Sequence, residues 1–111
     1  MAKYYKTDGS IKDVQPANGK FFVYKELQGF IVSEGFEEER MVQIVPLPDG
    51  IHSIVVNEEG KLIPLPVNLR GTAFWREVYP IDKYPNNNDG LIVGNMLVVS
   101  EKELEQDEDD K

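Results

Sequence analysis

The residues best suited to chemistry lie in the segment 68–76, NLRGTAFWR, which holds two arginines and the only tryptophan of the chain. Asn68 is a favourable N-cap for a helix that we expect to run through Glu77. A helix N-terminus and a guanidinium both attract anions, and an indole ring stacks on bases and cations. We therefore predict Asn68, Arg70 and Trp75 as ligand-binding residues, with a nucleotide as one suitable ligand. The more common arrangement for such residues is a buried aromatic side chain beside arginines that pair with acids.

Signals for catalysis are few. His52 is the only histidine, and its neighbour Ser53 points to the opposite face of the strand expected there, so the two cannot act as base and nucleophile. The sequence has no phosphate-binding loop, dinucleotide fingerprint, zinc-protease motif or calcium loop. Asp49, Glu58 and Glu59 offer oxygen ligands for a hard cation, but they are turn residues at opposite ends of the expected sheet. We predict no catalytic residue, no metal site and no cofactor.

Charge and composition exclude several classes of protein. The chain of 111 residues has a net charge of -8, and its segment 101–111 carries seven acidic residues and two lysines. An acidic balance disfavours direct binding of nucleic acid through phosphates. No stretch approaches the roughly 18 apolar residues that a membrane span needs, and the first residues lack a secretory signal pattern. With no cysteine in the chain, we expect a cytoplasmic protein without disulfides or a membrane partner.

The first hundred residues alternate between extended and helical patterns. Extended runs at 3–6 and 11–14 flank an Asp-Gly turn, which is a strong hairpin signal. Apolar residues recur at helical spacing from 20 to 32, and Asn18 is the expected N-cap of that helix. Residues 91–99, LIVGNMLVV, form a nearly continuous apolar run, which predicts a strand buried on both faces.

The central stretch 41–65 predicts a three-stranded antiparallel meander. Its extended runs cover 41–45, 51–56 and 61–63. Each turn between them ends in a glycine, Gly50 or Gly60, a residue that readily takes a left-handed backbone. We therefore predict positive φ at both glycines.

These elements together predict an α+β fold. A mostly antiparallel sheet of five or six strands would pack one face against a single main helix at 20–32. Residues 1–100 form the expected domain. The acidic segment 101–111 would begin as one helical turn, because Ser100 and Glu103 match a capping box, and would then fray.

Several motifs occur in the order found in one known family. They are Leu27-Gln28 and the segments VPLPDG at 45–50, VNEEGKL at 56–62, LPVN at 65–68 and DGLIVGN at 89–95. In these segments the chain resembles the family catalogued as domain of unknown function 3846. The resemblance implies a setting in bacteria, their phages or mobile elements, and it implies no reaction. The sequence departs from the family pattern after Gln28, where Gly29 is followed by Phe30.

We expect a non-enzymatic binding protein of a phage or mobile element that acts on a host or element protein. The alternative is a small-ligand binding protein that uses the segment 68–76. An enzyme is the least favoured class, because it would have to rely on carboxylates or on His52. A concave site with convergent polar groups would favour the small ligand, and a flat apolar patch would favour the protein partner.

Overall fold

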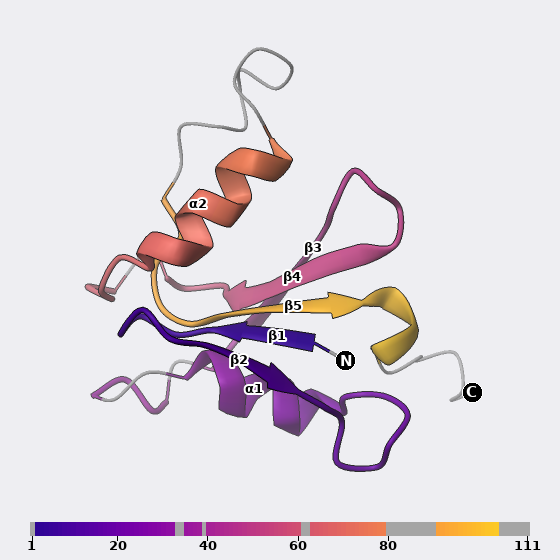
Figure 1. Cartoon of the computed structure of the whole chain (residues 1–111). Coiled ribbons are helices and arrows are strands. Elements are labelled where there is room, and N and C mark those ends of the chain that lie inside the picture. Colours follow the sequence, from indigo (N-terminus) through magenta and orange to yellow (C-terminus); the bar gives the residue numbers. More distant parts are fainter. Residues whose placement is uncertain (1, 33–34, 39, 61–62, 80–90, 105–111) are drawn as a thin grey trace.

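The computed structural model describes residues 2–32, 35–38, 40–60, 63–79 and 91–104 (Figure 1). The elements are β1 (Ala2–Tyr5), β2 (Ile11–Val14), α1 (Tyr24–Ile31), β3 (Val42–Pro46), β4 (His52–Asn57), α2 (Leu69–Val78), β5 (Met96–Ser100) and the 3-10 turn η1 (Glu101–Glu103). Within these ranges no helix has the length and apolar character needed to cross a membrane.

The strands form one five-stranded antiparallel sheet in the order β2-β1-β5-β4-β3. The two hairpins, β1–β2 and β3–β4, do not pair with each other, and β5 lies between them. The predicted α+β class with a mostly antiparallel sheet of five or six strands is confirmed, and the sheet has five strands.

Two helices cover the sheet, one on each face, as Figure 1 shows. Successive strand residues point to opposite faces, so Val55 and Leu97 face α1 and pack on its Leu27 and Ile31. Their neighbours on the strands, such as Ile54, face α2 and pack with its aromatic side chains. The helix predicted at 20–32 is therefore one of two layers, and the second layer is α2.

The first hairpin is as predicted, but α1 begins later than predicted. Its N-cap is Val23, whose N–H donates to the Glu26 carboxylate at 3.0 Å. Asn18, the predicted cap, instead accepts hydrogen bonds from the backbone N–H groups of Lys20 and Phe21. An asparagine stabilises a local turn as readily as a helix start. Asn18 does accept backbone hydrogen bonds, but it stabilises a turn before α1 and not the start of the helix.

The predicted three-stranded meander is wrong in its third strand. The hairpin β3–β4 forms, but the other edge of β4 pairs with β5, in a register that joins Ile54 to Val98. Ile63 lies in a turn, and Lys61 and Leu62 lie outside the described residues. A strand in the middle of a sheet with helices on both faces needs apolar side chains on both sides. The run in β5 supplies them, whereas the short run at 61–63 begins with a lysine.

The two turn glycines differ from each other. Gly50 has a φ of 72°, which confirms the left-handed turn between β3 and β4. Gly60 is not among the glycines at positive φ, so that prediction is wrong. A β-carbon at Gly60 would instead lie 3.0 Å from Cγ2 of Val93 and 3.2 Å from the carbonyl oxygen of Asn57. Close packing, not backbone conformation, requires glycine there.

The packed part of the chain extends past residue 100, where the predicted domain ends. Ser100 and Glu103 form the predicted capping box around η1. The carbonyl oxygen of Glu103 accepts a hydrogen bond from the N–H of Phe22 at 2.6 Å. Leu104 forms a bridge with Phe22 and packs against the core on the α1 side. Residues 105–111, the rest of the predicted frayed tail, lie outside the described residues.

The packing at Gly60 predicts a specific mutational coupling. Gly60→Ala should lower the free energy of unfolding by about 1–2 kcal/mol, because the new methyl group meets the side chain of Val93. Val93→Ala removes the contacting methyl groups, so Gly60→Ala should cost less in that background. Urea denaturation of the four proteins of this cycle measures the difference. Gly50→Ala is the control, because its cost comes from the left-handed backbone and nothing lies within 4 Å of its added β-carbon, so the cost should be the same in both backgrounds. Equal costs of Gly60→Ala in both backgrounds would contradict the packing explanation.

Candidate functional site, a groove between α2 and the β3–β4 hairpin

A groove with a volume of about 490 Å³ lies between α2 and the turn of the β3–β4 hairpin. Its lining residues are Leu47, Pro48, Asp49, His52, Phe74, Val78 and Val98. Five of these seven residues are apolar, and the two polar ones are neighbours in the same turn. The groove is therefore an apolar cleft with a single polar edge.

The register of the sheet explains why these residues meet. His52 of β4 lies opposite Ser100 of β5, so Val98, two residues earlier, points to the same face as His52. This is the face that α2 covers, and Phe74 and Val78 are one helical turn apart on α2. The ring of Phe74 also contacts the ring of Tyr5, with 5.7 Å between centroids, which anchors this side of the helix over β1.

The polar edge is a tight carboxylate–imidazole pair. Asp49 uses Oδ1 to accept hydrogen bonds from the N–H groups of Ile51 and His52, at 2.8 and 2.9 Å. Its other oxygen, Oδ2, lies 2.7 Å from Nδ1 of His52. The chain can turn back this sharply because Gly50 is left-handed and donates its N–H to the carbonyl of Leu47. One carboxylate thus fixes both the hairpin turn and the orientation of the imidazole.

These hydrogen bonds hold the pKa of Asp49 down to about 2, and the contact with the His52 side chain is the largest cause. The carboxylate is therefore ionised at neutral pH and only accepts hydrogen bonds. It follows that Nδ1 of His52 carries a proton and Nε2 is the nitrogen left for a ligand. Both side chains are about half exposed, at 45% each, so solvent and ligands reach the pair.

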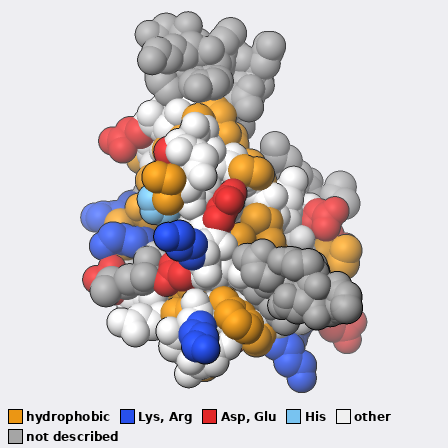
Figure 2. Space-filling view, turned by 90° about the vertical axis from the view of Figure 1, so that its right-hand side faces the viewer, with side chains coloured by type: hydrophobic (Ala, Val, Ile, Leu, Met, Phe, Trp, Pro, Cys, Tyr) orange, Lys and Arg blue, Asp and Glu red, His pale blue; other side chains and the backbone are white. Residues whose placement is uncertain are grey.

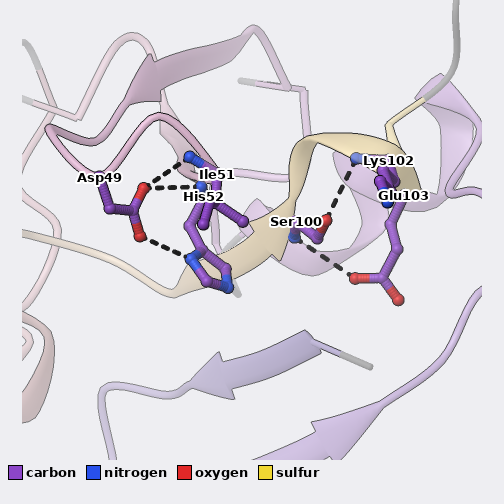
Figure 3. Close-up of polar contacts among 6 residues, drawn as sticks. All are labelled: Asp49, Ile51, His52, Ser100, Lys102 and Glu103. Carbon is purple, nitrogen blue, oxygen red and sulfur yellow. Dashed lines mark hydrogen bonds and ion pairs between the residues drawn. The ribbon is translucent and has the colours of Figure 1, made fainter.

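Within the described residues, no serine hydroxyl is hydrogen-bonded to this imidazole. Ser53 is buried on the opposite face, at 1% exposure, as the sequence predicts. Ser100 is the nearer serine along the sheet, but its hydroxyl oxygen accepts a hydrogen bond from the N–H of Lys102 in the cap of η1. Figure 3 shows the two groups side by side, with the bonds of Asp49 and His52 separate from those of Ser100. Among the described residues, no three histidine or acidic side chains gather to hold a metal ion.

Asn68 holds α2 in place and is completely buried, at 0% exposure. Its Oδ1 accepts from the N–H of Gly71, as an N-cap does. Its Nδ2 donates to the carbonyl oxygens of Tyr5 and Gly94, at 3.0 and 2.9 Å. A β-carbon at Gly71 would lie 3.0 Å from Cγ of Asn68, so the glycine lets the helix close over the amide. Both N–H groups and the oxygen of this carboxamide are therefore engaged inside the protein.

The structure does not bring the three predicted ligand-binding residues together. Asn68 is inside, and Arg70 is exposed on the first turn of α2. Trp75 is partly buried and packs on Tyr79, with 4.4 Å between ring centroids. On a helix, residues 70 and 75 are about 140° apart. The groove contains Phe74 from the predicted segment but neither Arg70 nor Trp75.

Sequence reasoning missed the groove for an identifiable reason. From the sequence alone, Asp49 is an ordinary turn residue and His52 is a strand residue without a catalytic partner. An aspartate three residues before a histidine, across a Pro-Asp-Gly turn, is a local signal that predicts their contact. The lining by Phe74, Val78 and Val98 has no such signal, because it depends on the crossing of α2 over strands distant in sequence.

The surface at this end of the molecule is mixed in character. Figure 2 shows hydrophobic side chains in small groups between basic and acidic ones, without one continuous apolar area. The exposed large hydrophobic residues in and beside the β3–β4 hairpin are Ile51, at 58%, Met41, at 50%, and Ile44, at 43%. Recognition at this end would therefore combine local apolar contacts with hydrogen bonds.

The buried amide of Asn68 predicts that aspartate cannot replace it. Asn68→Asp keeps the cap acceptor but turns two donors into a carboxylate oxygen facing two carbonyls. We expect the free energy of unfolding to fall by about 3 kcal/mol or more. Asn18→Asp is the matched control, because Asn18 is exposed and only its acceptor oxygen is used. Thermal and urea denaturation compare the two. A mild effect at Asn68, equal to that at Asn18, would contradict this account.

The lowered pKa of Asp49 predicts a pH-dependent stabilisation. An aspartate titrates near 3.9 in an unfolded chain and at about 2 here. Its contribution is therefore complete above about pH 4 and is lost as the pH falls through about 2. The stability advantage of the wild type over Asp49→Asn, measured by urea denaturation, should be present at about pH 5 and shrink below about pH 4. If the wild type keeps the same stability advantage over Asp49→Asn as the pH falls through about 2, the carboxylate is not its source.

No family model, curated protein or solved structure matches this chain.

Proposed function

We propose that this chain is a non-enzymatic binding protein whose groove receives an apolar side chain from a protein partner. The observation that carries the proposal is the apolar cleft between α2 and the β3–β4 hairpin, with the Asp49–His52 pair at its edge. From the motif resemblance we further propose a cytoplasmic protein of a phage or mobile element, acting on a host or element protein.

The chemistry of the groove suits recognition. Burying apolar surface contributes roughly 25 cal/mol per Å², and the residues Leu47, Phe74, Val78 and Val98 provide such surface. The imidazole adds direction, because its Nδ1 is held by Asp49 and its Nε2 is left to form one hydrogen bond with the partner. A partner segment with one apolar side chain beside a backbone or side-chain donor matches these two features.

A small ligand is the second candidate, and the concavity of the site is what favours it. The volume of about 490 Å³ falls within the range of about 300–1,000 Å³ typical of ligand pockets. Asn68 is buried and Arg70 and Trp75 are apart, so such a ligand would occupy the groove, which includes only Phe74 of the segment 68–76. The single polar edge matches a mainly apolar ligand better than a nucleotide, whose phosphates need cations or N–H groups.

Partner capture with groove variants tests the main proposal. Immobilised wild type, His52→Ala and Val78→Ser are incubated with bacterial lysate, and retained proteins are identified by mass spectrometry. Leu69→Ser is the matched control, because Leu69 lies on the same helix, is 76% exposed and does not line the groove. We expect one protein to be retained by wild type and control, and to be lost with Val78→Ser. Retention by Val78→Ser and His52→Ala at the level of the wild type would refute binding in the groove.

Thermal unfolding with a panel of small molecules, nucleotides included, tests the second candidate. A ligand of the folded state raises the melting temperature by mass action. A groove ligand should lose this effect with His52→Ala and keep it with Arg70→Ala. The reverse result, with Arg70→Ala abolishing the effect, would place the ligand on the segment 68–76 instead.

A further inference from the structure

The two edge strands of the sheet, β2 and β3, differ in their charged residues. Edge strands expose unpaired backbone groups, and proteins commonly protect them with charged residues. The edge strand β2 carries Lys12 and Asp13 among its four residues. The other edge strand, β3, has no charge from Met41 to Pro46, and no strand of the described chain pairs with its outer side. Edge β3 is therefore open to another strand.

The hydrogen-bond pattern shows which backbone groups of β3 point outward. The N–H of Leu47 donates to His52, and the carbonyl of Met41 accepts from Glu58, so odd-numbered residues bond to β4. In an antiparallel ladder the residues between them direct their N–H and C=O groups to the other side. The outward groups are therefore those of Val42 and Ile44, with Arg40 and Pro46 on either side.

At both ends of this outward row the carbonyl group already has a partner. The carbonyl of Arg40 accepts a hydrogen bond from Nε2 of Gln28 at 3.2 Å. At the other end, the carbonyl of Pro46 accepts from the hydroxyl of Tyr79 at 3.2 Å, and proline has no N–H to donate. Four groups are left between them, the N–H and C=O of Val42 and of Ile44. This short window is symmetric about Gln43.

We propose that two copies of this chain associate by pairing their β3 edges antiparallel about Gln43, which makes one continuous sheet. In that register Val42 lies opposite Ile44 of the second copy, and Ile44 lies opposite its Val42. Each such pair exchanges two hydrogen bonds, so all four outward groups find partners. Arg40 then lies opposite Pro46 of the second copy. The carbonyl of Arg40 is already bonded to Gln28, and the Pro46 that it faces has no N–H to donate. The outward N–H and C=O groups of Val42 and Ile44 are therefore all paired with those of the second copy.

The side chains of β3 are complementary in the same register. On the α1 face, Val42 meets Ile44 of the second copy, and Ile44 is 43% exposed in the single chain. On the α2 face, Met41, which is 50% exposed, meets Val45. Gln43 meets Gln43, and two carboxamides can donate to each other across the two-fold axis. Apolar cross-strand pairs each contribute roughly 0.2–1 kcal/mol, and no like charges face each other. The inference is independent of the proposed groove function.

The association state of the full chain, with Ile44→Lys as the disruptive variant, tests the proposal. Sedimentation equilibrium from micromolar to millimolar concentration should show a monomer–dimer equilibrium for the wild type. Ile44→Lys places two charges in the pairing and should shift the protein to monomer. Leu69→Lys is the matched control, because Leu69 is more exposed and lies on α2, away from the edge, and it should dimerise as the wild type does. A wild type that stays monomeric at every concentration overturns the proposal.

A cysteine at the two-fold axis tests the register even if Ile44→Lys does not fold. The chain has no cysteine, so Gln43→Cys introduces the only thiol. Directly opposite residues in a non-hydrogen-bonded pair have Cα atoms about 4.5 Å apart, which a disulfide spans. Under a mild oxidant, Gln43→Cys should form a covalent dimer quickly, and the control Leu69→Cys should not. A dimer that resists Ile44→Lys and does not cross-link through Gln43→Cys would use another surface, and the proposal would be wrong.

Discussion

The buried carboxamide of Asn68 is the interaction on which the position of α2 depends. It caps the helix through Gly71 and at the same time ties it to the end of β1 at Tyr5 and to the approach to β5 at Gly94. These three segments are far apart in sequence, and a side chain with one acceptor and two donors satisfies all of them. Because α2 forms one wall of the groove, the groove exists only where this amide places the helix.

The local features of the fold were predictable, and the long-range ones were not. The Asp-Gly turn before β2, the left-handed Gly50 and the cap at Asn68 depend on a few adjacent residues, and the structure confirms them. Which strand pairs with the second edge of β4 depends on a choice between the apolar runs 61–63 and 91–99. A local sequence pattern does not show which of the two is preferred. β5 pairs with β4 because its run is apolar on both faces, as a strand between two helical layers requires. At Gly60 the sequence predicts glycine for the turn, whereas Val93, distant in the chain, is what requires it.

The candidate site follows the same division. The Asp49–His52 contact lies within one turn and had a readable local signal. The apolar walls come from β5, α2 and the hairpin, and only the crossing of these elements brings Phe74, Val78 and Val98 together. Asn68 differs from these residues. Its residue type predicts a ligand-binding amide, but its side chain is 0% exposed and has a structural role. Residue type identifies what a side chain can bond, and packing decides whether a ligand reaches it.

The place of β5 in the sheet also bears on how the protein is made. Synthesis proceeds from the N-terminus, so β5 is the last of the five strands to leave the ribosome, although it is the middle one. Until then the β1–β2 and β3–β4 hairpins have no shared neighbour, and an isolated hairpin is marginally stable in water. Until β5 joins them, the nascent chain therefore exposes the edges of β1 and β4 with which β5 pairs. A chaperone that binds unpaired strands would find its substrate in this interval.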